Sequence, residues 1–173
     1  AVRHRDGPDG GRHRALMGRV GQHLAELNIG RLLAPTDDPR VAEFMDNLDR
    51  VNGLGKRMPG FVWMMEGSGE PGTGNTDAKI GGDPQFVSNL TVWTDLPCLE
   101  RFVRDTIHAR FLERRAAWFE VMGPQHFVMW HVPEGHRPTL DEALSRLELR
   151  RTQGDTPEAF GWDWARANLD SAH

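Results

Sequence analysis

The chain has 173 residues and a mass of 19.5 kDa, and its 38% hydrophobic content is enough for the core of one domain. A formal net charge of −4 argues against a nucleic acid or an anionic membrane surface as the partner. The single cysteine, Cys98, excludes an intrachain disulfide and a cysteine-rich zinc site, and no apolar run approaches the length that crosses a bilayer. We therefore expect a cytoplasmic protein without a nucleic-acid or membrane partner.

The first half of the chain predicts a tail, two strands, a helix and a loop. Residues 1–22 are rich in arginine and glycine and lack the apolar core of a signal peptide, which favours a flexible tail. Alternating apolar residues predict a strand at 23–31, and helically spaced apolar residues behind an aspartate cap predict a helix that ends near Leu54. The apolar stretch 61–66 predicts a central strand, and the glycine-rich stretch 67–85 predicts a long loop.

The second half predicts two more strands and two more helices. A third strand is expected at 87–93, followed by a long helix from about 97 to 122 that a Gly-Pro pair ends. A fourth strand is expected at 126–132, and a capping box begins a helix that reaches about Arg151. Residues 152–173 hold two tryptophans in weakly regular sequence and are expected to form a C-terminal tail.

The predicted order, β-α-β-β-α-β followed by a helix, is that of an α+β, ferredoxin-like domain over residues 23–151. Such a domain has an antiparallel sheet with both long helices on one face. Because the strands at 61–66 and 126–132 are apolar on both sides, the opposite face is expected to be buried as well. A second copy of the chain would cover it, so we expect a homodimer that forms a dimeric α/β barrel.

Several blocks of the sequence carry a resemblance to a known family. They lie between residues 23 and 161 and read HLAELNIGR, PGFVW, NLTVW, RRAAWF, VPEGHRPTLDEALSRL and TPEAF. On these blocks the chain resembles the uncharacterised bacterial family called domain of unknown function 3291. That family in turn is similar to the antibiotic-biosynthesis-monooxygenase-like group of dimeric α/β barrels. The group includes cofactor-independent oxygenases of polyketide quinols, heme-degrading enzymes and stress-related proteins, so the resemblance implies a fold and leaves the activity open.

His108 falls on the long predicted helix, on one stripe with Phe111, Arg115 and Trp118. The resemblance implies a pocket between the sheet and this helix. An imidazole there can ligate a heme iron or act as a base, and an arginine beside aromatic rings can bind a carboxylate or a heme propionate. The alternative is a half-exposed histidine packed on Phe111, beside arginines on a solvated face.

Two asparagines are further candidates for the same pocket. Asn28 lies inside an apolar strand, where asparagine is disfavoured, and Asn89 lies in the third strand. An amide can donate to a developing oxyanion, and the heme-degrading relatives imply a similar first-strand asparagine together with a helix histidine. The alternative for Asn28 is an amide that satisfies a neighbouring loop backbone.

Aromatic and sulfur-containing residues of the strands are candidates for a flat pocket wall. Trp93 shares a strand face with Asn89, and Trp63 shares a face with Met65. Together they could hold a polycyclic ligand or a macrocycle. The alternative is that they form the core and the dimer interface.

A metal site made of protein side chains is not predicted. His126, His131 and His136 recur every five residues, but a strand points the first two to opposite faces. The only metal considered is therefore a heme iron bound by His108.

Three functions remain open. The leading hypothesis is a small-molecule enzyme of the monooxygenase-like type, which oxidises an aromatic or polycyclic substrate with O₂. In it His108 acts as the base, and Asn28 and Asn89 stabilise the resulting anion. The first alternative is a heme-binding protein or heme-dependent enzyme with His108 as the axial ligand. The second is a non-catalytic dimeric ligand-binding or stress protein. The substrate and the cofactor (none or heme) stay undecided at this level.

Overall fold

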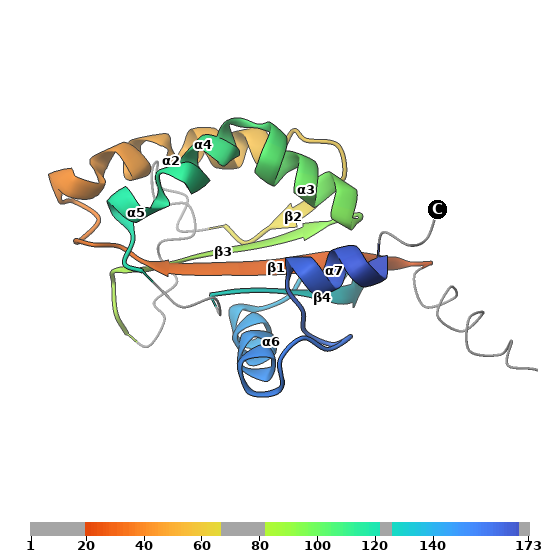
Figure 1. The fold of residues 1–173 in the computed structure, drawn as a ribbon. Helices are drawn as coiled ribbons and strands as arrows, with labels where there is room; N and C mark the ends of the chain where they lie inside the picture. The colour runs from red at the N-terminus through yellow and green to blue at the C-terminus, as the bar shows by residue number, and fades with distance from the viewer. Residues whose placement is uncertain (1–19, 67–81, 122–125, 170–173) are drawn as a thin grey trace, which may run out of the picture.

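The computed structural model describes residues 20–66, 82–121 and 126–169, which form an α+β fold with a four-stranded antiparallel sheet (Figure 1). The strands are β1 (Gln22–Arg31), β2 (Phe61–Met64), β3 (Phe86–Trp93) and β4 (Phe127–Pro133), in the spatial order β2-β3-β1-β4. The helices are η1 (Pro39–Val41), α2 (Ala42–Gly55), α3 (Leu96–Asp105), α4 (Ile107–Glu113), α5 (Arg115–Trp118), α6 (Leu140–Gln153) and α7 (Trp162–Leu169). The strand order agrees with the ferredoxin-like arrangement predicted from the sequence, but β2, which was predicted to be central, lies at an edge of the sheet.

Two of the predicted segments lie largely outside this description. Residues 1–19 of the predicted N-terminal tail and residues 67–81 of the predicted long loop are not among the described residues. Within the described ranges, none of the helices combines the length and the apolar character needed to cross a bilayer.

Helices α2, α3, α4 and α5 lie over one face of the sheet (Figure 1). Strand alternation turns Leu24, Glu26 and Asn28 of β1 toward this helix layer. Part of the apolar side chains between the layer and the sheet form one cluster with the C-terminal segment. Its buried members are Leu24, Val51, Trp93, Leu96, Leu99, Phe102, Met129, Phe160 and Ala165.

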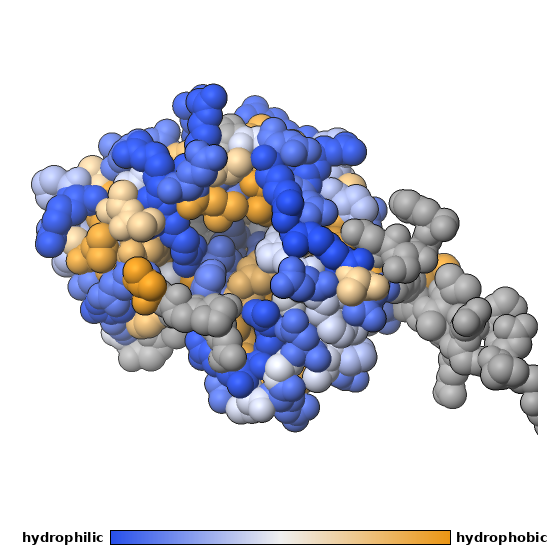
Figure 2. Space-filling view, in the orientation of Figure 1, coloured by the Kyte–Doolittle hydropathy of each residue, from blue (hydrophilic) through white to orange (hydrophobic). Residues whose placement is uncertain are grey.

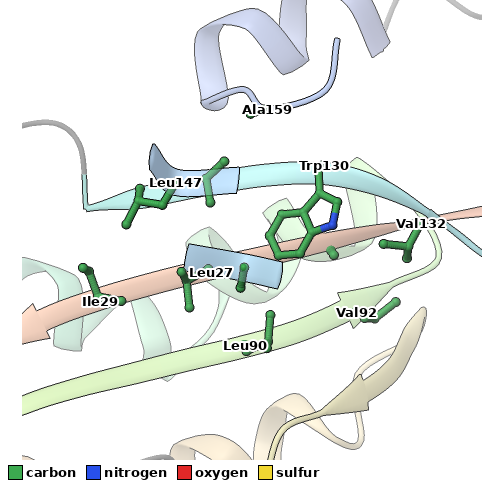
Figure 3. Packing of buried hydrophobic residues seen from close by; sticks show 11 residues of the cluster. Leu27, Ile29, Leu90, Val92, Trp130, Val132, Leu147 and Ala159 are labelled. Carbon is green, nitrogen blue, oxygen red and sulfur yellow. The ribbon is translucent and has the colours of Figure 1, made fainter. Parts of the chain in front are cut away.

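Helix α6 covers the opposite face of the sheet (Figure 1). Its Ala143 and Leu147 pack in one cluster with Leu27 of β1 and Trp130 of β4 (Figure 3), and all four are fully buried. The sequence pattern predicted that this face would be bare in one chain and would need a second copy. The chain's own helix buries it, so the homodimer remains a prediction that this face does not support.

The long helix predicted at 97–122 is three shorter helices, because the backbone is extended at Thr106 (φ −121°, ψ −178°) and turns again at Arg114. The Thr106 hydroxyl donates to the Phe102 carbonyl oxygen and accepts from the His108 amide at 3.2 Å. One hydroxyl therefore ends α3 and caps α4. This break fixes where His108 and Arg115 lie relative to the sheet.

The segment after α6 is folded, whereas the sequence predicted a tail over 152–173. Phe160 exchanges two backbone hydrogen bonds with Met129 of β4, and its side chain is fully buried. Trp162 begins α7 and stacks on Phe127, with ring centroids 5.5 Å apart. Aromatic side chains supply the buried area that docks this segment, although its sequence has weak periodicity.

Candidate functional site

The molecule is hollowed between the sheet and the helix layer (Figure 2). Two cavities of about 100 and about 300 Å³ lie there. Both are lined by Asn28, Asn89, His108, Leu112 and Arg115. The smaller cavity extends toward α2 and the larger toward α7, and the larger one reaches the size of small-molecule pockets, about 300–1,000 Å³.

The floor of the larger cavity is a polar patch in an otherwise apolar sheet. Asn28 and Asn89 are register partners across β1 and β3, and both line the cavity. The next inward pair along the two strands is Glu26 and Thr91, of which Glu26 also lines the cavity. Strand alternation therefore places a carboxyl group beside the two amides that the sequence pointed to.

Glu26 is a buried carboxyl group with an altered acidity. It is 6% exposed, and no cation lies within ion-pair distance of it among the described residues. Burial raises the pKa of Glu26 from 4.5 to about 7, although the Thr91 hydroxyl, which donates to Oε1 at 2.8 Å, partly counters this rise. A carboxyl group with a pKa near 7 can exchange protons in both directions at neutral pH.

His108 lies over the same floor in its neutral form. Burial lowers its pKa to about 4, a hydrogen bond to the Val103 backbone partly opposes this effect, and the charge of Arg115 adds to it. The ring packs against Phe102, with centroids 4.9 Å apart. Its Nδ1 is buried and has no hydrogen-bond partner among the described residues, and the same is true of Asn28 Oδ1.

Arg115 brings a positive charge to the cavity. Its Nη2 donates to the Ile29 carbonyl oxygen at 3.1 Å, and its guanidinium lies 4.8 Å from the centre of the Phe119 ring. Burial lowers the pKa of Arg115 below its usual range. The absence of a side chain at Gly30 makes room for this arrangement, because a Cβ atom there would lie 3.0 Å from Nη2 and 2.6 Å from Phe119 Cδ1.

A known protein family matches most of the chain. The model of the family described as "Domain of unknown function (DUF3291)" matches residues 23–172. This chain belongs to that family. The resemblance carried by the sequence blocks is thereby confirmed, and the match extends through the C-terminal segment that the sequence had suggested to be a tail. No curated protein matches the chain.

Three solved structures are similar to this DUF3291 chain in part. The NE2512 protein of unknown function from Nitrosomonas europaea is 11% identical, with 69% of this chain and 95% of that chain covered and a TM-score of 0.42. PA3566 from Pseudomonas aeruginosa is 14% identical, with 66% and 96% covered and a TM-score of 0.43. SnoaB, a cofactor-independent oxygenase from Streptomyces nogalater, is 19% identical, with 70% and 99% covered and a TM-score of 0.34.

Six of the nine residues proposed from the sequence meet around the smaller cavity of this DUF3291 chain. They are Asn28, Asn89, His108, Phe111, Arg115 and Trp118. The remaining wall of this cavity is mostly apolar and includes Phe44, Leu48, Val51 and Phe119. The arrangement can enclose an aromatic ring beside amide, imidazole and guanidinium groups.

The other three proposed residues are not in the lining of either cavity. Trp63 and Met65 pack against the core on the α6 side of the sheet. A register shift between Phe61 and Trp63 reverses the alternation of β2, so that Phe61 packs on the helix side and Trp63 on the other. Trp93 has the predicted orientation but is fully buried against Phe102, with ring centroids 5.3 Å apart.

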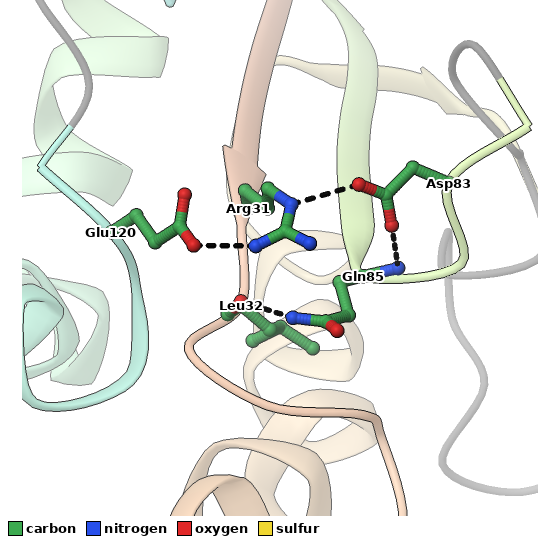
Figure 4. A network of polar contacts seen from close by, with 5 residues as sticks. All are labelled: Arg31, Leu32, Asp83, Gln85 and Glu120. Atoms are coloured by element: carbon green, nitrogen blue, oxygen red, sulfur yellow. Dashed lines mark hydrogen bonds and ion pairs between the residues drawn. The ribbon is translucent and has the colours of Figure 1, made fainter.

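Arg31, another arginine near the end of β1, has a different role. Its Nε donates to Asp83 at 2.8 Å, and its Nη1 donates to Glu120 (Figure 4). Gln85 completes this network by donating to the Leu32 carbonyl oxygen at 2.9 Å. Arg31 therefore ties the end of β1 to neighbouring segments and is neutralised by two carboxylates.

Sequence reasoning missed two parts of the site. One is Glu26, whose signal was a charged residue at an inward position of an apolar strand. The other is the C-terminal segment, which gives Asp155, Trp162 and Asp163 to the lining of the larger cavity. Arg150 of α6 holds this segment in place, because it donates to Asp155 at 2.7 Å and to the Phe127 carbonyl oxygen at 2.6 Å.

Proposed function

We propose that this chain is a small-molecule enzyme that removes a proton from an aromatic phenol or quinol bound in the cavity, and that the resulting anion then reacts with O₂. The observation that carries the proposal is the buried Glu26 carboxyl, with its pKa raised to about 7, at the floor of a cavity lined by Asn28 and Arg115. Catalytic acids and bases gain most from a pKa near the working pH.

Glu26 is assigned as the base in place of His108, which the sequence suggested. A histidine whose pKa is lowered to about 4 stays neutral at pH 7 and is a weak proton acceptor. The ring of His108 instead limits the space above the amides of Asn28 and Asn89, since all three residues line both cavities.

Arg115 and the cavity amides stabilise the anion in this proposal. Removing a proton from a phenol, or from the CH₂ carbon of its keto tautomer, leaves a negative charge that an oxygen carries. A guanidinium and an amide N–H that are already in place lower the energy of such a charge, most strongly where water is scarce.

The O₂ step is the part of the proposal that derives from the sequence resemblance. The carbanion form of the substrate adds O₂ and becomes a hydroperoxide after it takes up one proton. Loss of water then turns the carbon into a carbonyl, so one CH₂ group and one O₂ give one C=O group and one H₂O. Glu26 receives the proton from carbon and returns it to the peroxide.

The test is O₂ uptake by the purified protein with 1,8-dihydroxyanthrone, corrected for the reaction without protein. We expect Glu26→Gln to lower the enzymatic rate by about 100-fold or more, as for loss of a general base. The matched control is Glu148→Gln, an exposed carboxylate on α6, which should leave the rate unchanged. Equal rates for Glu26→Gln and the wild type would overturn the assignment of the base.

Heme does not fit the site as it stands. His108 Nδ1 has no accessible surface, so a metal cannot reach this ring nitrogen. The larger cavity, about 300 Å³, is also at the lower end of the range for drug-sized ligands, and heme is larger and rigid. Titration with hemin checks this conclusion, because a Soret band that saturates at one heme per chain and is lost in His108→Ala would contradict it.

A further inference from the structure

The cavity contains one cationic side chain whose charge is not matched within the described residues. Arg115 contacts the Ile29 carbonyl oxygen and the Phe119 ring, and no carboxylate of the described ranges lies within ion-pair distance of it. A guanidinium has five N–H donors in a planar fork. Most of this donor capacity is therefore available to a ligand.

The other charged groups of the lining are paired. Asp155 accepts from Arg150 at 2.7 Å, and Asp163 lies 3.6 Å from Arg166. Glu26, the remaining acidic group of the larger cavity, is buried, and burial raises its pKa, which favours its uncharged form. Around Arg115 the balance of charge is thus positive, which favours an anionic ligand.

The rest of the larger cavity is suited to aromatic rings. Its apolar lining consists of Leu99, Phe102, Val103, Leu112, Phe127 and Trp162. Arg115 reaches β1 at Ile29, and Glu26 lies three residues away on the same strand, which is a distance of about 10 Å. A ligand that touches both groups must therefore be longer than a single ring.

We propose that the cavity binds an aromatic carboxylate of two or three fused rings, with the carboxylate paired to Arg115 and the far ring next to Glu26. The inference rests on the proposed function for the role of Glu26, and it names the class of substrate. A planar carboxylate matches the guanidinium fork through two parallel hydrogen bonds.

The test is isothermal titration calorimetry of the full chain with 2-naphthoate and with 2-naphthamide, which has the same shape and no charge. We expect 2-naphthoate to bind at least tenfold more tightly, as for a charge-assisted hydrogen-bonded pair. Equal affinities for the two compounds, or tighter binding of 2-naphthamide, would overturn the inference from the wild-type protein alone.

Two variants locate the carboxylate. Arg115→Met should remove the preference for 2-naphthoate, and Arg115→Lys should keep part of it, because it retains the charge and loses the planar fork. The matched control is Arg110→Met, an exposed arginine of α4 outside both cavities, which should keep the full preference. A preference that survives in a folded Arg115→Met protein would place the carboxylate elsewhere and refute the inference.

The binding experiment tests the ligand class, and the turnover experiment tests the proposed enzyme, so either proposal can be refuted without the other. Preferential binding of 2-naphthoate through Arg115, without any Glu26-dependent O₂ uptake, would refute the proposed enzyme and leave the ligand class in place. Glu26-dependent O₂ uptake with 1,8-dihydroxyanthrone, without a preference for 2-naphthoate, would refute the ligand class alone.

Discussion

Thr91 and Glu26 lie directly opposite each other in the β1–β3 ladder, and the Thr91 hydroxyl donates to Glu26 Oε1 at 2.8 Å. The same hydroxyl accepts from Trp93 Nε1 at 2.9 Å. The bond from Thr91 lowers the pKa of Glu26, whereas burial raises it, and burial is the larger effect. The acidity of the assigned base is thus adjusted by a side chain on the neighbouring strand.

Thr91→Val should raise the pKa of Glu26 further, because it removes the bond that favours the carboxylate. Since the deprotonated form is the base, the rate of O₂ uptake should begin to rise at a higher pH than in the wild type. A pH–rate profile measures this shift, with Thr152→Val on the distant α6 as the control. A midpoint that stays in place or moves to lower pH would show that another group titrates.

Glu26→Gln should increase the stability of the protein at pH 8 and leave it nearly unchanged at pH 4. The folded-state pKa of about 7 lies above the ordinary value of 4.5, so the folded chain binds more protons between these two pH values, and the free energy of unfolding falls as pH rises. At about 1.4 kcal/mol for each pKa unit, the full loss is about 3 kcal/mol. Urea unfolding of the wild type and of Glu26→Gln at pH 4 and pH 8 measures this loss. An equal pH dependence of stability in the two proteins would contradict a raised pKa of Glu26.

His108→Phe should change the pH dependence of stability in the opposite direction. The pKa of His108 in the folded chain, about 4, lies below its ordinary value of 6.5. The unfolded chain therefore binds more protons between pH 4 and 6.5, and the free energy of unfolding falls as the solution is acidified. The phenyl ring can keep the contact with Phe102 and does not titrate. We expect the variant to lose less stability than the wild type between pH 7 and pH 4.5 in urea unfolding.

Gly30→Ala should weaken both the fold and the binding of 2-naphthoate. The added Cβ would lie 2.6 Å from Phe119 Cδ1 and 3.0 Å from Arg115 Nη2, so both side chains must move. Overpacking of this kind costs about 1–3 kcal/mol. Gly53→Ala in α2 is the control, because its Cβ would meet open space and alanine favours a helix by roughly 0.5–1 kcal/mol. Thermal unfolding and calorimetry measure the two effects, and unaltered binding in Gly30→Ala would contradict the placement of Arg115.

The strands and much of the site could be predicted because they depend on regular periods. A period of two placed Asn89 and Trp93 on one face of their strand, and a step of three to four placed His108 near Arg115. The family blocks implied a pocket between the sheet and this helix. These relationships survive small errors in the bounds of the elements.

The remaining features depend on interactions that no period reveals. The hydroxyl of Thr106 breaks the helix through two local hydrogen bonds, and a register shift after Phe61 moves Trp63 to the other face of the sheet. The docking of Phe160 and Trp162 depends on surfaces formed by distant strands. The raised pKa of Glu26 is a consequence of burial, which only the assembled sheet and helices determine.

The position of α6 also limits how two copies of this chain can associate. Two sheets can stack face to face only where their apolar faces are accessible, and in this chain Trp130 and its neighbours are already enclosed by Ala143 and Leu147. Stacking through that face would first require α6 to detach, at the cost of exposing its own apolar side. Association that leaves α6 in place therefore cannot bring the two sheets together through this face.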